Sequence, residues 1–203
     1  PIISYSIRTA IKSNIFSKIH VSTDNLEIKK ISEKYNIKID FMRPKYLAKD
    51  NVGLIEVLKY VSKKYKNLGF DFDEVWLIMP CSPLINYNDL IKAATTYENS
   101  NLNKILLSVT EYPVPIQWSY KMKTNKSLIP NFKNFIDLDS KKIEKNYHDN
   151  GSFVAYNFNN VIKNRISKNQ FIGYEIPKDR SIDIDDELDW NIAEALYLKK
   201  NNI

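Results

Sequence analysis

The run Val75–Met79 constrains the fold most, because its five residues are all apolar and it stops abruptly at Pro80. A strand that is apolar on both sides is buried on both faces, which is typical of a parallel strand covered by helices. We therefore expect this strand at the centre of a sheet. The residues Pro80-Cys81-Ser82-Pro83 form the loop that follows it.

Helical and strand patterns alternate along the rest of the chain. Apolar residues at three- and four-residue spacing predict helices, and short β-branched runs predict strands at 18–22, 38–42, 104–110, 152–158 and 173–176. This alternation predicts an α/β fold with three layers and an open, mostly parallel sheet, in a single domain over residues 1–203. Ligands bind such sheets beyond the carboxyl ends of the strands.

Residues 113–147 interrupt the alternation with polar, turn-rich sequence. This excursion is too polar to build a core, yet it contains Trp118, Tyr120, Phe132 and Phe135. We expect these apolar side chains to be covered by other parts of the protein or by a partner. Either a second subunit covers them in a homodimer, or the excursion folds back over its own sheet as a lid.

Composition excludes several classes of protein. The chain has 30 basic and 24 acidic residues, but its lysines are scattered over the whole length, so we expect no nucleic-acid partner. A single cysteine allows no internal disulfide and no multi-cysteine zinc site. No apolar run approaches the ~20 residues of a membrane span, and we expect a cytoplasmic protein. The four glycines are too far apart for a P-loop or a dinucleotide fingerprint.

The acidic stretch Asp183–Asp189 is the best candidate for chemistry. In an extended segment, Asp183 and Asp185 point to the same side, and two carboxylates on one side suit Mg²⁺. Magnesium bound in this way serves phosphoryl and nucleotidyl transfer. Alternatively, Asp185 or Asp186 caps the last helix. The spacing alone leaves both interpretations open.

Five ordered motifs resemble those of the CMP-nonulosonic acid synthetases, the acylneuraminate cytidylyltransferases. They are Ile2–Ile7, Val21–Asp24, Arg43–Asp50, Pro80–Leu84 and Ile182–Asp185. The segments Tyr112–Gln117 and Tyr147–Phe153 most resemble the pseudaminic acid branch. The resemblance implies a Rossmann-like nucleotidyltransferase that joins CTP to an acidic nine-carbon sugar, giving CMP-sugar and pyrophosphate. It also implies a homodimer formed through the element inserted at 113–147.

The same resemblance implies the site residues. Asp183 and Asp185 match the metal-binding pair for Mg²⁺ and are the expected catalytic residues. The nucleotide-binding residues are expected to be Asp24, Arg43, Cys81 and Ser82, and the sugar-binding residues Gln117, Tyr147, His148 and Phe153. Without the resemblance, Arg43 would be a surface ion-pair residue, Ser82 part of a plain turn, and the aromatic residues packing for the excursion.

Family members begin with a strand and a basic loop around the triphosphate, and this sequence starts just after the position of that loop. If the loop were absent, the chain would bind a nucleotide or a sugar without turnover. A second alternative is cytidylyl transfer to another acid sugar, such as sialic acid or an eight-carbon keto acid.

Overall fold

The computed structural model describes residues 1–100, 104–167 and 169–201. Its centre is a four-stranded sheet in the order β1-β5-β2-β6, and a separate two-stranded sheet pairs β3 with β4. The strand bounds are β1 Glu74–Ile78, β2 Ile105–Glu111, β3 Tyr120–Met122, β4 Leu128–Pro130, β5 Tyr147–Asn157 and β6 Phe171–Glu175.

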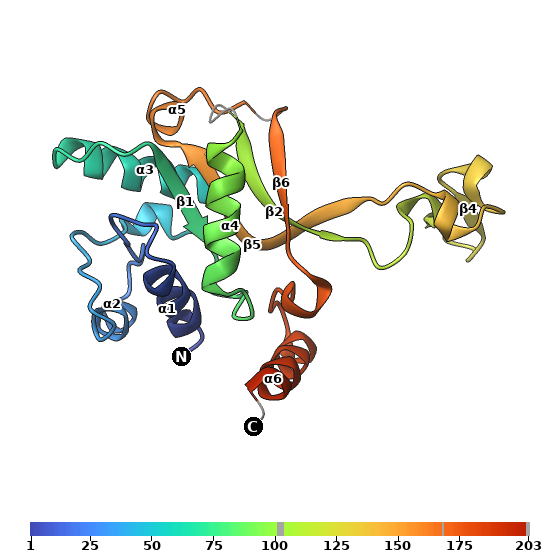
Figure 1. Ribbon diagram of the computed structural model, residues 1–203, viewed down its shortest axis with the longest axis horizontal. Helices are drawn as coiled ribbons and strands as arrows, with labels where there is room; N and C mark the ends of the chain where they lie inside the picture. Colours follow the sequence, from blue (N-terminus) through green and yellow to red (C-terminus); the bar gives the residue numbers. More distant parts are fainter. Residues whose placement is uncertain (101–103, 168, 202–203) are drawn as a thin grey trace.

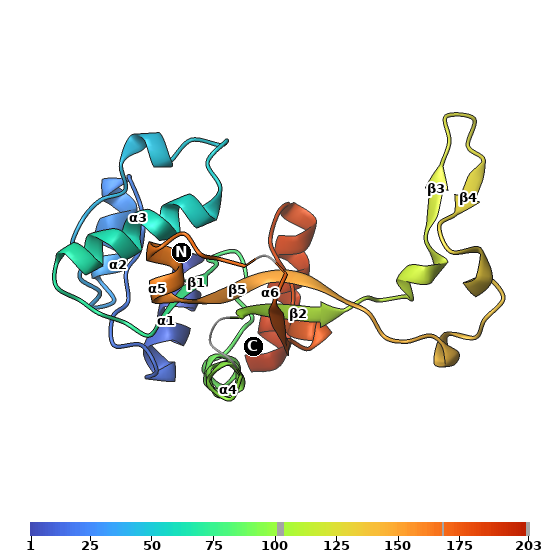
Figure 2. The same cartoon turned by 90° about the horizontal axis from the view of Figure 1, so that it is seen from above.

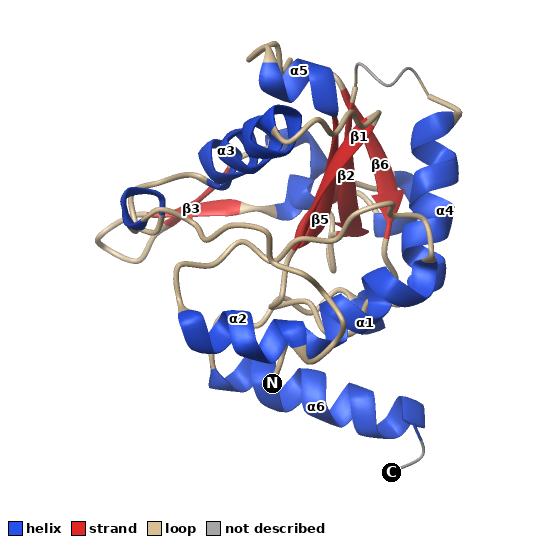
Figure 3. Cartoon of the chain, turned by 90° about the vertical axis from the view of Figure 1, so that its left-hand side faces the viewer, coloured by secondary structure: helices blue, strands red, loops and turns tan. Residues whose placement is uncertain are grey.

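Helices cover both faces of the central sheet, which gives the expected three layers. Helix α4 lies on one face, and α3 and α5 lie on the other (Figure 3). Helix α1 packs beside α4, and α2 beside α1. The helix bounds are α1 Ile3–Ser13, α2 Leu26–Glu33, α3 Leu54–Asn67, α4 Tyr87–Glu98, α5 Phe158–Ile162 and α6 Glu187–Asn201. The predicted α/β class is confirmed.

The sheet is mixed. Strands β2 and β6 pair in parallel, whereas β5 is antiparallel to both β1 and β2, so β1, β2 and β6 share one direction. Strand β5 lies between β1 and β2 because the chain returns from the 113–147 excursion and runs back through the sheet. The sequence pattern predicted this strand but not its direction.

The core lies between the sheet and α4. Leu90, Ala93 and Tyr97 of α4 are fully buried against Leu106 and Phe153 of the sheet. Helix α4 begins with a capping box, in which the Asn86 side chain accepts hydrogen bonds from main-chain N–H groups of the first turn. The cap and the apolar stripe of α4 together fix this helix against the sheet.

Strand β1 lies at the edge of the sheet. Its apolar run predicted a place at the centre, and that prediction is wrong. Among the described residues the strand pairs only with β5. The predicted strands at 18–22 and 38–42 have no regular secondary structure and join neither sheet. A cavity of about 830 Å³ with mainly apolar walls is lined by residues 15–22 and by β1. A strand is defined by hydrogen bonds to a neighbour, which residue patterns alone cannot supply.

A polar cluster lies along one wall of this cavity. The Tyr65 hydroxyl donates to Asp40 Oδ2 at 2.9 Å and lies 3.0 Å from Nδ1 of His20. The Lys18 ammonium pairs with the same carboxylate at 2.5 Å. Burial lowers the pKa of His20 from 6.5 to about 4, and the hydrogen bond from Lys18 lowers the pKa of Asp40.

We expect His20 to make the protein less stable in mild acid. The unfolded chain takes up a proton below pH 6.5 but the folded chain only near pH 4, so the free energy of unfolding falls as the pH drops between these values. The loss is about 1–3 kcal/mol, because each pKa unit corresponds to ~1.4 kcal/mol and the half-buried ring is partly screened. Urea unfolding from pH 7 to 4 measures it. His20→Gln should remove this component, and an unchanged pH slope in that variant would contradict the assignment.

Residues 113–146 form an arm that extends away from the body (Figure 1). The β3–β4 hairpin lies at its far end (Figure 2). Within the arm, the Trp118 indole donates to the carbonyl of Phe135 at 3.0 Å, and the rings of Phe132 and Phe135 meet edge to face. The arm therefore has its own local contacts and does not fold back as a lid over the sheet.

Within the described residues, no helix combines the length and the hydrophobicity needed to cross a membrane.

Candidate functional site

The carboxyl ends of β1, β2 and β6 lie along one edge of the sheet. Strand β1 continues into Pro80–Pro83, β2 into the arm, and β6 into the segment that carries Asp183. Strand β5 begins at the same edge, because Tyr147 pairs with Glu111 and Phe153 with Ile78. Loops from distant parts of the sequence are thus brought together where α/β sheets bind their ligands.

Two of these loops meet strand β5, at Cys81, Asp183 and Gly151. The Ile184 N–H donates to the Cys81 carbonyl at 3.0 Å, and the Ser82 hydroxyl donates to the Gly151 carbonyl at 3.3 Å. Gly151 has φ +67°, and a Cβ there would fall inside van der Waals contact of Asp183 Oδ2 and 2.9 Å from its Cγ. The carboxylate of Asp183 therefore rests directly on the Gly151 backbone, in space that only glycine leaves free.

The electrostatics at this point favour a cation. Burial, followed by the carboxylate of Asp183, raises the pKa of the Cys81 thiol to about 12, and Asp185 adds to the effect. The negative charges of Asp183 and Asp185 therefore both act at the Cys81 side chain. Asp183 Oδ1 is buried and has no hydrogen-bond partner among the described residues. A buried carboxylate oxygen without a partner is costly unless a ligand satisfies it.

Capping of the last helix is performed by Asp186 and Asp189. The Asp186 carboxylate accepts from the Asp189 N–H at 3.0 Å, and the Asp189 carboxylate accepts from the N–H groups of Asp185 and Asp186. This reciprocal pattern is a capping box. It removes the helix-cap alternative for the side chain of Asp185, and the carboxylates of Asp183 and Asp185 are left for another role.

This pair fits Mg²⁺, which takes one or two carboxylates and completes its shell with water and substrate phosphates. In the part of the chain that the structure describes, no group of three or more His, Cys, Asp or Glu residues forms a metal site by itself.

Arg43 and Asp24 lie on neighbouring loops. The Arg43 guanidinium donates to the Ser22 carbonyl at 2.6 Å, and its main-chain N–H donates to the Thr23 carbonyl at 2.8 Å. Arg43 Nε is buried and unpartnered among the described residues. Asp24 is exposed one residue further on. These contacts replace the surface ion pair considered for Arg43 and bring the two predicted nucleotide-binding residues together.

Two predicted binding residues serve the scaffold instead. Ser82 has no exposed surface, and its hydroxyl is used by the Gly151 carbonyl. Phe153 is also fully buried, and its ring packs between Trp76 and Tyr174 in the core. Neither side chain has surface left for a substrate. Cys81 stays half-exposed next to Asp183.

The remaining predicted sugar-binding residues lie at the base of the arm. The ring of His148 lies 4.7 Å from that of Tyr112, and its Nδ1 is 2.8 Å from the Asp149 carbonyl. Tyr147 is 44% exposed. Gln117 lies on a short helical turn, and its Oε1 is buried without a partner among the described residues. Tyr147 and His148 share the carboxyl edge of the sheet with Asp183.

The large cavity beside β1 is not this site. Its walls are mainly apolar, and one of them is β1. Arg43, Met79 and Pro80 bound it next to the Cys81 loop. A charged nucleotide does not suit apolar walls, so we place the chemistry at the carboxylates beyond this end of the cavity.

Sequence reasoning missed two features of the site. One is the contact between Gly151 and Asp183, which has no local signal because 32 positions separate the two residues. The other is a buried ion pair between Asp89 and Arg180. The Asn86–Asp89 spacing signals a helix cap, and nothing in the sequence links Asp89 to Arg180.

Comparison with known proteins identifies relatives over nearly the whole chain. A family model described as cytidylyltransferase matches residues 1–176. The chain is 29% identical over 207 residues to N-acylneuraminate cytidylyltransferase of Escherichia coli, which covers 99% of this chain and 47% of that protein. It is 29% identical over 198 residues to pseudaminic acid cytidylyltransferase of Campylobacter jejuni, covering 97% of this chain and 85% of that protein. The chain thus spans about half the length of the first relative and most of the second.

Solved structures share the fold. The structure of CMP:2-keto-3-deoxy-manno-octonic acid synthetase complexed with CTP matches with a TM-score of 0.68 and 12% identity, over 100% of this chain and 89% of that one. The 4-diphosphocytidyl-2C-methyl-D-erythritol synthase of Anaerococcus prevotii matches with a TM-score of 0.62 and 13% identity, over 98% and 89%. At these identities the likeness establishes the fold.

Proposed function

Because the chain belongs to the cytidylyltransferase family, we propose that it joins CTP to an acidic nine-carbon sugar, giving CMP-sugar and pyrophosphate. The observation that carries this proposal is the meeting of Asp183, Gly151 and Cys81 at the carboxyl edge of the sheet. The family match and the names of the two relatives support the substrate class.

The reaction needs alignment and charge neutralisation more than covalent chemistry. The anomeric hydroxyl oxygen of the sugar forms a bond to the α-phosphorus of CTP, the bond from that phosphorus to pyrophosphate breaks, and the hydroxyl proton is released. Fixed groups that hold the two reactants in line supply much of the rate. In this proposal Arg43 and Asp24 hold the cytidine end, and the base of the arm holds the sugar.

Asp183 and Asp185 would hold Mg²⁺, which when bound offsets the charge of the triphosphate. The half-buried position of Asp183 limits the access of water to its carboxylate. Its contact with Gly151 fixes the direction from which a ligand can approach.

A pyrophosphate-release assay over a panel of nucleotides and acid sugars tests this function. We expect release with CTP and a nonulosonic acid such as pseudaminic or sialic acid, and little with ATP, GTP or UTP. If pyrophosphate is released only with an eight-carbon keto acid, the substrate belongs to that class of sugar and the proposed nine-carbon class is wrong. Binding of CTP without release for any sugar would make the chain a binding protein.

His148 is the residue we expect to contact the sugar. Its ring stands beside Tyr112 at the base of the arm, and Tyr147 next to it is exposed. His148→Ala should raise the Michaelis constant for the sugar about tenfold, the cost of one lost hydrogen bond, and leave that for CTP unchanged. Steady-state kinetics with each substrate varied in turn measure both. A rise for CTP alone would move His148 to the nucleotide pocket.

The arm is proposed to form a homodimer. Its exposed apolar side chains are concentrated on a segment too thin to bury them itself: Val114, Tyr120, Met122, Leu128, Ile129, Phe132, Ile136 and Leu138. A second copy of the chain would cover this surface symmetrically.

Sedimentation at micromolar concentration should show a dimer. Met122→Asp should shift it to monomer, because the change places a charge in the apolar contact. Leu26→Asp is the matched control, since Leu26 on α2 is 65% exposed, as is Met122, and lies in the body. A monomeric wild-type protein with full activity would refute the dimer.

A further inference from the structure

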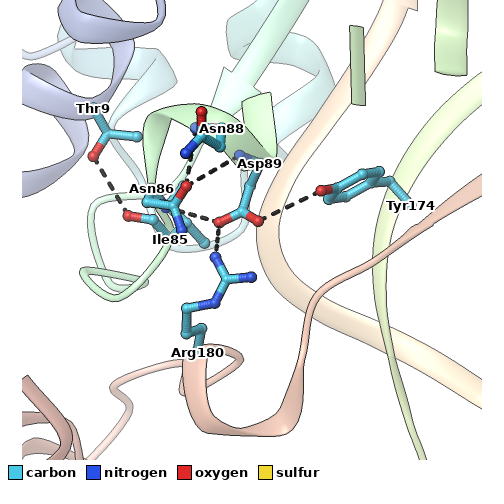
Figure 4. A network of polar contacts seen from close by, with 7 residues as sticks. All are labelled: Thr9, Ile85, Asn86, Asn88, Asp89, Tyr174 and Arg180. Carbon is cyan, nitrogen blue, oxygen red and sulfur yellow. Dashed lines mark hydrogen bonds and ion pairs between the residues drawn. The ribbon is translucent and has the colours of Figure 1, made fainter. Parts of the chain in front are cut away.

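A buried ion pair joins the segment before Asp183 to helix α4. Arg180 Nη1 pairs with Asp89 Oδ2, and the side chains of these residues are 18% and 4% exposed (Figure 4). Asp89 Oδ2 also accepts from the Asn86 N–H at 2.9 Å, and the Tyr174 hydroxyl lies 3.5 Å from Oδ1. One carboxylate therefore links the start of α4, strand β6 and Arg180.

Main-chain hydrogen bonds anchor the segment from β6 to α6 at both of its ends. At its start the Ile176 N–H donates to the Val109 carbonyl at 2.7 Å, and Ile176 is fully buried. At its end the Ile184 N–H donates to the Cys81 carbonyl. Between these points, Arg180 supplies the buried side-chain contact, whereas Lys178 pairs with Glu111 at 3.7 Å and is 54% exposed. Asp183 thus lies three residues after Arg180 and directly before the Ile184 anchor.

We infer that Asp89 and Arg180 are positioning residues that hold Asp183 in the orientation needed to bind a divalent cation. The inference rests on the proposed function of Asp183. A buried ion pair adds little net stability compared with apolar packing, so stability alone is a weak reason for placing one here. The rigid, planar guanidinium fixes the direction of its partner, and Asp89 is itself fixed by the capping box of α4. The ion pair therefore ties the segment that carries Asp183 to the rigid start of α4.

Arg180 acts through Asp183 and not on the substrate. Its charge is already neutralised by Asp89, in a site that is nearly closed to solvent. Residues that orient a metal ligand without touching the metal typically contribute a 10–100-fold factor in metal affinity. We therefore expect a loss of this size when the pair is broken.

Binding of Mn²⁺ alone, followed by electron paramagnetic resonance without nucleotide or sugar, tests this role. Arg180→Gln should weaken Mn²⁺ binding about tenfold or more. Lys178→Gln is the matched control on the same turn and should leave the affinity unchanged. The double variant Asp89→Asn with Arg180→Gln leaves no buried charge unpaired, so its melting temperature should recover relative to Arg180→Gln while its Mn²⁺ affinity stays low. If the ion pair had only a structural role, the double variant would recover both its melting temperature and its Mn²⁺ affinity.

The two possible failures are distinguishable with Asp183→Asn. Normal Mn²⁺ affinity in folded Arg180→Gln or in the double variant, with a loss in Asp183→Asn, would overturn the positioning role alone. Normal affinity in Asp183→Asn as well would overturn the metal role of Asp183 and this inference with it. If Arg180→Gln does not fold, the double variant decides the question.

Discussion

Asp183→Asn is expected to lower kcat/KM for CTP by about 100-fold or more, the scale for losing one preorganised electrostatic contact in an active site. The melting temperature should stay the same or rise, because the change removes a charge from a half-buried carboxylate whose Oδ1 has no partner among the described residues. Steady-state kinetics and thermal unfolding of one preparation measure both quantities. Full activity in this variant would refute the role of Asp183.

Asp186→Asn is the matched control for this change. Asp186 lies three residues further on and caps α6 through the Asp189 N–H. Asparagine caps a helix about as well as aspartate, so the variant should keep both its stability and its activity. A large loss of activity in Asp186→Asn would show that the whole acidic segment is sensitive to charge and that Asp183 is not special.

Gly151→Ala is expected to have an effect on activity of similar size. The added Cβ would overlap Asp183 Oδ2, and the carboxylate would have to move away from the Cys81 loop. The positive φ of Gly151 adds a backbone cost of about 1 kcal/mol to the free energy of unfolding. We expect a fall of about 100-fold in kcat/KM, with a protein that still folds.

Gly69→Ala separates these two costs. Gly69 has φ +87°, but a Cβ there would have no atom within 4 Å. This variant should lose a similar amount of stability and keep its activity. If Gly69→Ala and Gly151→Ala have the same kcat/KM, the contact between Gly151 and Asp183 does not matter for turnover.

The helices and most strands could be predicted because their signals are local. Asn86 and the apolar stripe behind it predict α4, and the spacing of Leu58 and Tyr65 predicts α3, in which both are buried. The run at Val75 predicts β1. Its place at the edge of the sheet could not be predicted, because a strand's position depends on partners that lie far away in the sequence.

The last helix shows the limit of a periodic pattern. The four-residue spacing of Leu188 and Ile192 predicts an apolar stripe on α6, yet they are 66% and 40% exposed. Periodicity indicates that a helix has an apolar side but not what covers it. Likewise, Phe153 resembles a site residue in its motif, whereas its place in the strand register points it into the core.

The candidate site was predictable in part, through the ordered motifs. They led to Asp183, Arg43 and Cys81, and the structure sets Cys81 against Asp183. Asp89 and Arg180 could not be found in this way, because a helix cap and a short charged turn are ordinary surface features in a sequence. Their meaning depends on tertiary packing that places the guanidinium of Arg180 on a buried carboxylate.

The most direct test of the central claim is to follow the α-phosphorus of CTP. CTP labelled with ³²P at this position is incubated with the protein, Mg²⁺ and a nonulosonic acid, and the products are separated. The account predicts that the label moves into a CMP-sugar and that one pyrophosphate appears for each molecule formed. Label that stays in CTP, although CTP binds to the protein, would contradict cytidylyl transfer.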